Sequence, residues 1–146
     1  MNTTGLDVFD TTILKTNAWL ADLTEHLEIE DRDEAYRVLR AVLHAIRDQL
    51  GATENAQLAA QFPMLLRGLY FEGWRPFAGD RARTREEFEE LVMAKHGARP
   101  YVNASEMMRA VADTMRRHIE PHEVDKALHC LTEPVQDLFS GSTVLV

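Results

Sequence analysis

Apolar residues recur along most of the chain at intervals of three and four, the spacing of one face of an α-helix. The two clearest stripes lie in residues 35–50 and 104–119. No segment alternates as a half-buried strand does, and only the short run 143–146 favours β structure. The pattern predicts an all-α protein with these two stripes at the centre of its core. The stripes comprise Ala35, Val38, Leu39, Val42, Ile46 and Leu50, and Met107, Met108, Val111, Met115 and Ile119.

Helix starts are marked by a capping residue followed three positions later by glutamate. This spacing occurs at Asp31–Glu34, Thr84–Glu87 and Asn103–Glu106. Shorter helices are predicted to begin near Thr53, Pro63, Pro121 and Thr132. Together with an amphipathic helix over residues 13–27, these signals predict about eight helices.

The chain overlays itself without a gap when it is shifted by 69 residues. Identities are few, but apolar positions match through four helices, which indicates a structural repeat. We predict two pseudo-symmetric four-helix halves, packed as one compact bundle because about 65 residues alone make a marginal core. The predicted boundaries are 1–72, a connecting segment 73–83, and 84–146. Matched pairs include Trp19 with Phe88, Leu23 with Val92, Val42 with Val111, and Ile46 with Met115.

Three segments carry a resemblance to a known family. They are TNAWL at 16–20, AYRVLRAVLHAIRD at 35–48 and AQFPMLLRGLYFEGWRP at 60–76. The chain resembles the bacterial DUF2267 family over essentially its whole length, more specifically in the first half. In the second half, Thr132-Glu133-Pro134 stands where the first half has Phe62-Pro63-Met64. The resemblance implies a small, soluble, all-helical bacterial protein and supplies no established activity.

Composition narrows the classes of partner. A net charge of −8 disfavours nucleic acid and anionic membranes, whose phosphates a negative surface repels. The single cysteine, Cys130, permits no internal disulfide and no Cys-x-x-Cys zinc site. Residues 1–10 lack the features of a signal peptide, and no apolar run reaches the roughly 20 residues that span a bilayer. We therefore expect a cytoplasmic protein that binds neither nucleic acid nor membrane.

Metal and cofactor signatures are missing from the sequence. His118, His122 and His129 lie near one another, but no His-Glu-x-x-His or Glu-x-x-His motif includes them. No Gly-x-Ser-x-Gly motif and no phosphate-binding glycine loop occurs either. We therefore predict no catalytic residues, no metal and no cofactor.

The first candidate binding site is the segment 67–76, which combines arginines, aromatic residues and a carboxylate. Such side chains are typical of partner anchors. The alternative is structural: Gly68 would allow close helix packing, and Trp74 would fix the connection between the halves to the core. In either case the Arg75 guanidinium should stay accessible to solvent. The candidate residues are Arg67, Tyr70, Glu72, Trp74 and Arg75.

The second candidate is a pair of arginine stripes at equivalent positions of the two halves. Arg40 and Arg47 lie on one predicted helix, and Arg109 and Arg116 on its counterpart. Converging guanidiniums could bind an anion between the halves. The alternative is that each arginine pairs with acidic neighbours on a solvated face.

Two functions from different classes follow, and a third stays open. The first is a non-enzymatic interaction or regulatory module that binds a protein partner or self-associates as a homodimer. The alternative is a small-molecule or anion-binding protein that uses the cleft between the two halves. The third is an enzyme of a type that no motif identifies.

Overall fold

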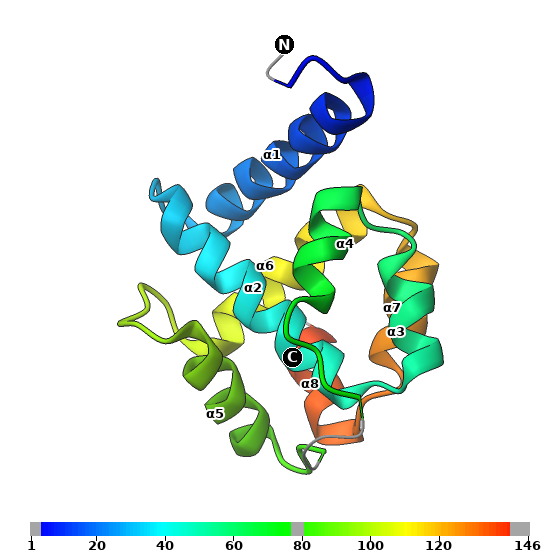
Figure 1. Ribbon diagram of the computed structural model, residues 1–146. Coiled ribbons are helices and arrows are strands. Elements are labelled where there is room, and N and C mark those ends of the chain that lie inside the picture. Colours follow the sequence, from blue (N-terminus) through cyan, green and yellow to red (C-terminus); the bar gives the residue numbers. More distant parts are fainter. Residues whose placement is uncertain (1–3, 77–80, 141–146) are drawn as a thin grey trace.

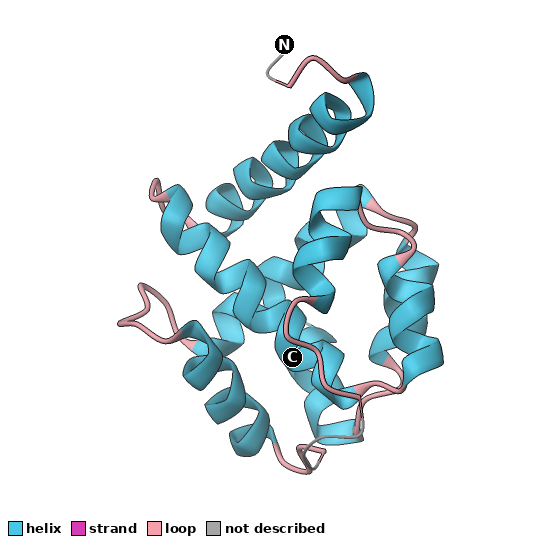
Figure 2. Cartoon of the chain, viewed as in Figure 1, coloured by secondary structure: helices cyan, strands magenta, loops and turns pink. Residues whose placement is uncertain are grey.

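The computed structural model describes residues 4–76 and 81–140, so the β-leaning run 143–146 lies outside the described residues. Within these ranges the chain forms eight α-helices and no strand (Figures 1 and 2). The all-α prediction is confirmed. The helices are α1 (Asp7–Leu27), α2 (Arg32–Gln49), α3 (Ala52–Ala59), α4 (Met64–Phe71), α5 (Arg85–His96), α6 (Ala104–His118), α7 (Pro121–Leu128) and α8 (Glu133–Ser140).

The first residue of each of the three predicted capping pairs caps its helix through its side chain. The Asn103 side chain accepts a hydrogen bond from the backbone N–H of Glu106. The Glu106 side chain in turn accepts one from the backbone N–H of Asn103, which completes a capping box. Thr84 caps α5, and Asp31 caps α2. A helix begins near Thr53 as predicted, but Thr53 does not cap it: the N-cap of α3 (Ala52–Ala59) is Gly51, without a side-chain hydrogen bond.

Helices α2 and α6 lie at the centre of the molecule (Figure 1). Helix α2 packs against α1, α4, α5 and α6, and α6 packs against α1, α2, α5, α7 and α8. Every residue of the two predicted stripes is buried, so the prediction of the core is confirmed. The high burial follows from their central position, since each helix is covered on several sides.

The helix boundaries agree with the 69-residue offset in most places. Helices α3 and α7, and likewise α4 and α8, begin and end 69 residues apart. The first helices differ, because α1 has 21 residues and α5 has 12. Helix α1 packs on α6, and α2 packs on α5, so the first two helices of each proposed half lie against helices of the other half. The spatial superposition of the halves and their exact division stay predictions.

Candidate functional site

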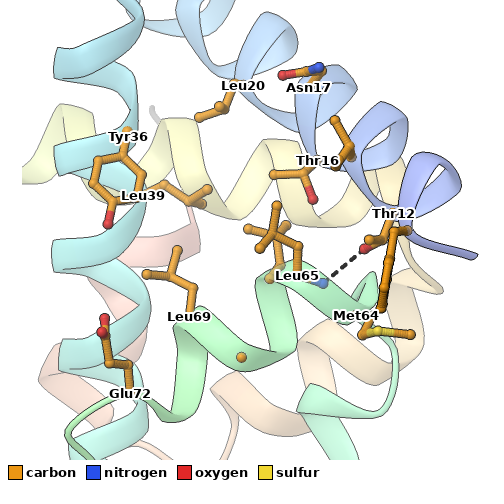
Figure 3. Close-up of a pocket in the computed structure, with 14 residues that line it drawn as sticks. Thr12, Thr16, Asn17, Leu20, Tyr36, Leu39, Met64, Leu65, Leu69 and Glu72 are labelled. Carbon is orange, nitrogen blue, oxygen red and sulfur yellow. Dashed lines mark hydrogen bonds between the residues drawn. The ribbon is translucent and has the colours of Figure 1, made fainter. Parts of the chain in front are cut away.

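A groove of about 660 Å³ with a mostly apolar lining lies between α1, α2 and α4 (Figure 3). Large apolar side chains stay exposed along it, including Met64 at 45% and Leu65 at 50%. The ionisable residues of the lining are Tyr36 and Glu72. The lining consists of Phe9, Thr12, Ile13, Thr16, Asn17, Leu20, Tyr36, Leu39, Met64, Leu65, Leu66, Gly68, Leu69 and Glu72.

Helix α4 forms one wall of this groove and is fixed at both ends. At its start, the backbone N–H of Leu65 donates to Thr12 Oγ1 on α1 at 2.8 Å. At its end, His44 Nε2–H donates to the Leu69 carbonyl at 2.7 Å. Burial lowers the pKa of His44, which favours the neutral imidazole. The groove is therefore held open by contacts that need no ligand.

Arg47 completes the fixation of α4. Its guanidinium is buried, and Nη1 donates to the carbonyls of Tyr70 at 3.1 Å and Glu72 at 2.8 Å. Its Nε contacts Asp48 Oδ1 at 2.9 Å, and Lys95 Nζ contacts the other oxygen at 2.7 Å. Burial opposes ionisation of Asp48, but the hydrogen bonds from Lys95 and Arg47 outweigh it and lower the pKa of that carboxyl.

Thr16 is the most unusual polar residue of the groove. Its side chain is 8% exposed, and its Oγ1 has no hydrogen-bond partner among the described residues. Figure 3 shows the residue on the side of α1 that faces α4. Asp10 Oδ2 is likewise buried and without a partner among these residues, but the other oxygen of Asp10 accepts from Thr4. Because an unsatisfied buried hydroxyl costs about 1–3 kcal/mol, Thr16 marks a position where a ligand group could bind.

The segment 67–76 contributes mainly to structure. The Tyr70 hydroxyl is buried and donates to Asn55 Oδ1 at 2.5 Å, and burial raises the pKa of the phenol. Arg67 donates to the carbonyls of Ala59 and Phe62, which ties α4 to the end of α3. Of the five predicted site residues in this segment, Glu72 lines the groove.

The position of Trp74 favours the structural alternative for the segment 67–76. Trp74 is half-buried and packs against α4, the helix that carries Arg67 and Tyr70, with 5.3 Å between the ring centroids of Trp74 and Phe71. Arg75 is exposed, as expected. Gly68 is exposed, and a Cβ added there would meet nothing within 4 Å, so the prediction of a close helix contact is wrong.

The four arginines of the two stripes contact different groups. Besides the buried Arg47, Arg40 donates to the Lys95 carbonyl at 3.4 Å. Arg116 pairs with Asp125 at 3.1 Å, and Arg109 is exposed beside a separate depression. These contacts support the pairing alternative for Arg47 and Arg116. Anion binding by the four together stays a prediction.

A buried polar pair joins α2 to α5. Glu34 Oε2 accepts from His96 Nε2–H at 2.9 Å and from the Tyr101 backbone N–H at 3.2 Å. The sequence suggested only a capping role for Glu34, yet its side chain bonds to residues 62 and 67 positions away. Nothing in the local pattern reveals such a long-range pair.

The histidines of the second half do not converge. His118 contacts Asp22 and stacks on Trp19 at 5.4 Å between ring centroids, whereas His122 and His129 are exposed. No group of three or more His, Cys, Asp or Glu side chains in the described parts of the chain could hold a metal ion. In those same parts, no helix is long and apolar enough to cross a membrane.

The fold and the groove define a small all-α protein with an apolar recess of ligand size. Residues 16–138 match the family described as "Uncharacterized conserved protein (DUF2267)", and the chain belongs to this family. The resemblance found in the sequence is confirmed. No curated protein matches the chain.

Proposed function

We propose that this protein is a non-enzymatic helical binding module, and that it holds a small apolar molecule in the groove between α1, α2 and α4. The observation that carries the proposal is an apolar recess of about 660 Å³ whose walls are already fixed. Ligand sites are typically largely preformed, mostly apolar clefts of about 300–1,000 Å³. The proposal keeps the small-molecule alternative but places the site within the first half instead of between the halves.

The lining sets the expected strength of binding. Burial of one methylene contributes about 0.8 kcal/mol, so an octyl chain gives about 6 kcal/mol before ordering costs. That energy corresponds to a Kd of tens of micromolar at best, and the cost of association weakens it further. Binding of a simple eight-carbon ligand should therefore be measurable below about 1 mM.

Methionine methyl groups provide a direct test. The Met64 side chain lines the groove, whereas Met107, Met108 and Met115 are buried in α6. In a protein labelled with ¹³C at the methionine methyls, titration with octan-1-ol should shift the Met64 signal saturably. The signals of the three α6 methionines should stay nearly fixed, since they lie in the core.

A groove-filling variant shows whether the shift reports binding in the groove. Gly68→Phe places a ring where a side chain meets nothing within 4 Å, next to the apolar lining, and should abolish the saturable shift. Ala56→Phe adds the same ring on the exposed surface of α3 and should leave binding unchanged. Circular dichroism confirms that both variants fold. Absence of saturation below 1 mM, or equal binding by folded Gly68→Phe, would refute the proposal.

Self-association as a homodimer stays a prediction. Leu6, Val8 and Leu14 are exposed apolar residues at the start of α1, outside the groove lining. Sedimentation velocity over a hundredfold range of protein concentration tests this prediction. A monomer throughout the range would contradict it and would leave the groove proposal intact.

A further inference from the structure

We infer that the natural ligand of the groove carries an uncharged hydrogen-bonding group, a hydroxyl or a carbonyl, that pairs with the Thr16 hydroxyl. Its hydrocarbon part would cover the apolar side chains of α1 and α4. This inference rests on the proposed function and adds the chemical class of the ligand and the residue that orients it.

Thr16 differs from other threonines of the helices in the hydrogen bonding of its side chain. A threonine inside a helix usually bonds to a carbonyl three or four residues earlier. Thr24 donates to the Ala21 carbonyl at 2.7 Å, and Thr114 to the Ala110 carbonyl at 2.8 Å. Thr16 makes no such bond with the described residues, although its side chain is as deeply placed as a core residue. Its hydroxyl is therefore unpaired among these residues, but its oxygen is covered in the structure, so a ligand group reaches it when the Thr16 side chain rotates toward the groove that the residue lines.

The surroundings of Thr16 select an uncharged partner. The groove that Thr16 lines is covered mostly by apolar side chains, such as Leu20, Leu39 and Leu66. An ionised group placed there would lose its hydration without gaining a counter-charge. Two other polar side chains of the lining already have partners: Asn17 Oδ1 accepts from Arg32 at 2.7 Å, and Thr12 Oγ1 accepts from the Leu65 N–H at 2.8 Å.

The charge at the far end of the groove also disfavours an anion. Glu72 is exposed and closes the end opposite Asn17 (Figure 3). The whole chain carries a net charge of −8, which lowers the local concentration of anions. A fatty acid-like carboxylate therefore fits less well than an alcohol, ketone or ester of the same length.

Four probes of equal chain length test the inference: octan-1-ol, 1-fluorooctane, octanoate and octylammonium. The affinity of the wild-type protein for each is measured from the Met64 methyl shift. Octanol should bind roughly 5–10-fold more tightly than fluorooctane, the ratio expected of one hydrogen bond. Octanoate and octylammonium should bind at least about 10-fold more weakly than octanol.

Two variants assign the difference to Thr16. Thr16→Val keeps the shape and removes the hydroxyl, so octanol should lose roughly 5–10-fold in affinity while fluorooctane changes less than about twofold. Retained fluorooctane binding also shows that the variant is folded. Thr24→Val removes a hydroxyl bonded to its own helix, outside the groove lining, and should preserve the preference for octanol.

The outcomes separate the inference from the proposed function. Equal octanol affinity of wild type and Thr16→Val, with binding still abolished by Gly68→Phe, would overturn the role of Thr16 and leave the groove as a binding site. Tightest binding of octanoate or octylammonium would overturn the uncharged class. Failure of all four probes to bind would refute the proposed function itself.

Discussion

Replacement of Arg47 by methionine should lower the free energy of unfolding by about 3–4 kcal/mol. Methionine keeps the aliphatic stem but removes the buried donors that hold the Tyr70 and Glu72 carbonyls. Hydrogen bonds from a charged group are each worth about 1.5–3 kcal/mol, so two give about 3–6 kcal/mol. The lower part of this range applies because Glu72 is exposed, and water can replace one donor.

Urea denaturation followed by circular dichroism measures this loss, and a thermal scan should show a midpoint lower by about 6–16 °C. Arg40→Met is the matched control, since Arg40 lies on the same helix but makes a single contact of 3.4 Å to a carbonyl. Arg40→Met should lower the free energy of unfolding by less than about 1 kcal/mol. The reasoning fails if Arg47→Met stays within 1 kcal/mol of the wild type, or if Arg40→Met is equally destabilising.

Five further substitutions test other parts of the structure by the same measurement. Val42→Asp or Val111→Asp buries an uncompensated charge in a central helix and should cost about 3–5 kcal/mol; unchanged melting would contradict the core assignment. Trp74→Ala should cost only about 1–2 kcal/mol, less than for a fully buried aromatic, because the indole is half-buried on Phe71; a loss above 3 kcal/mol would show deeper packing. Gly68→Ala should raise the free energy of unfolding by about 0.5–1 kcal/mol, since alanine favours the helix and its methyl group meets nothing within 4 Å. A destabilised variant would show that the space beside Gly68 is not open. Burial lowers the pKa of His44 below 6.5, so the unfolded chain binds more protons at this residue than the folded chain. The free energy of unfolding should therefore fall as the pH drops below about 6.5. His44→Gln should reduce that fall, and identical pH profiles for the variant and the wild type would contradict this role of His44.

Much of the fold could be predicted because its signals are local. The stripes of α2 and α6 follow from helical spacing, and Thr84 and Asn103 mark helix starts through bonds that span three residues. Where the local signal was ambiguous, the prediction failed. Thr53 has the chemistry of a cap, but Gly51 occupies the N-cap position and Thr53 lies inside the first turn of α3.

The groove could not be predicted, because it depends on which apolar residues stay uncovered. Periodicity places Ile13 and Leu20 on the buried stripe of α1, yet both are only partly buried and line the groove. The adjacent exposed pair Met64 and Leu65 was a usable signal, but it lies in a segment rich in arginine and aromatic residues that suggested a different surface. Similarly, Arg47 looked like a solvated charge, and only tertiary contacts show it buried.

The length of α1 explains why the groove lies in the first half. Helix α1 has 21 residues and α5 has 12, although both end at equivalent positions of the 69-residue offset. The extra turns of α1 carry Phe9, Thr12 and Ile13, which form one wall of the groove. In the second half, the described residues 81–84, which precede α5, are not helical: the Ala82 N–H donates to Gln49 Oε1 at 2.7 Å, and its carbonyl accepts from Thr132 at 3.2 Å. Ala82 is buried by these contacts, whereas the extra turns of α1 form a wall of the groove, so the asymmetry between the first helices creates a site that the repeat alone would not provide.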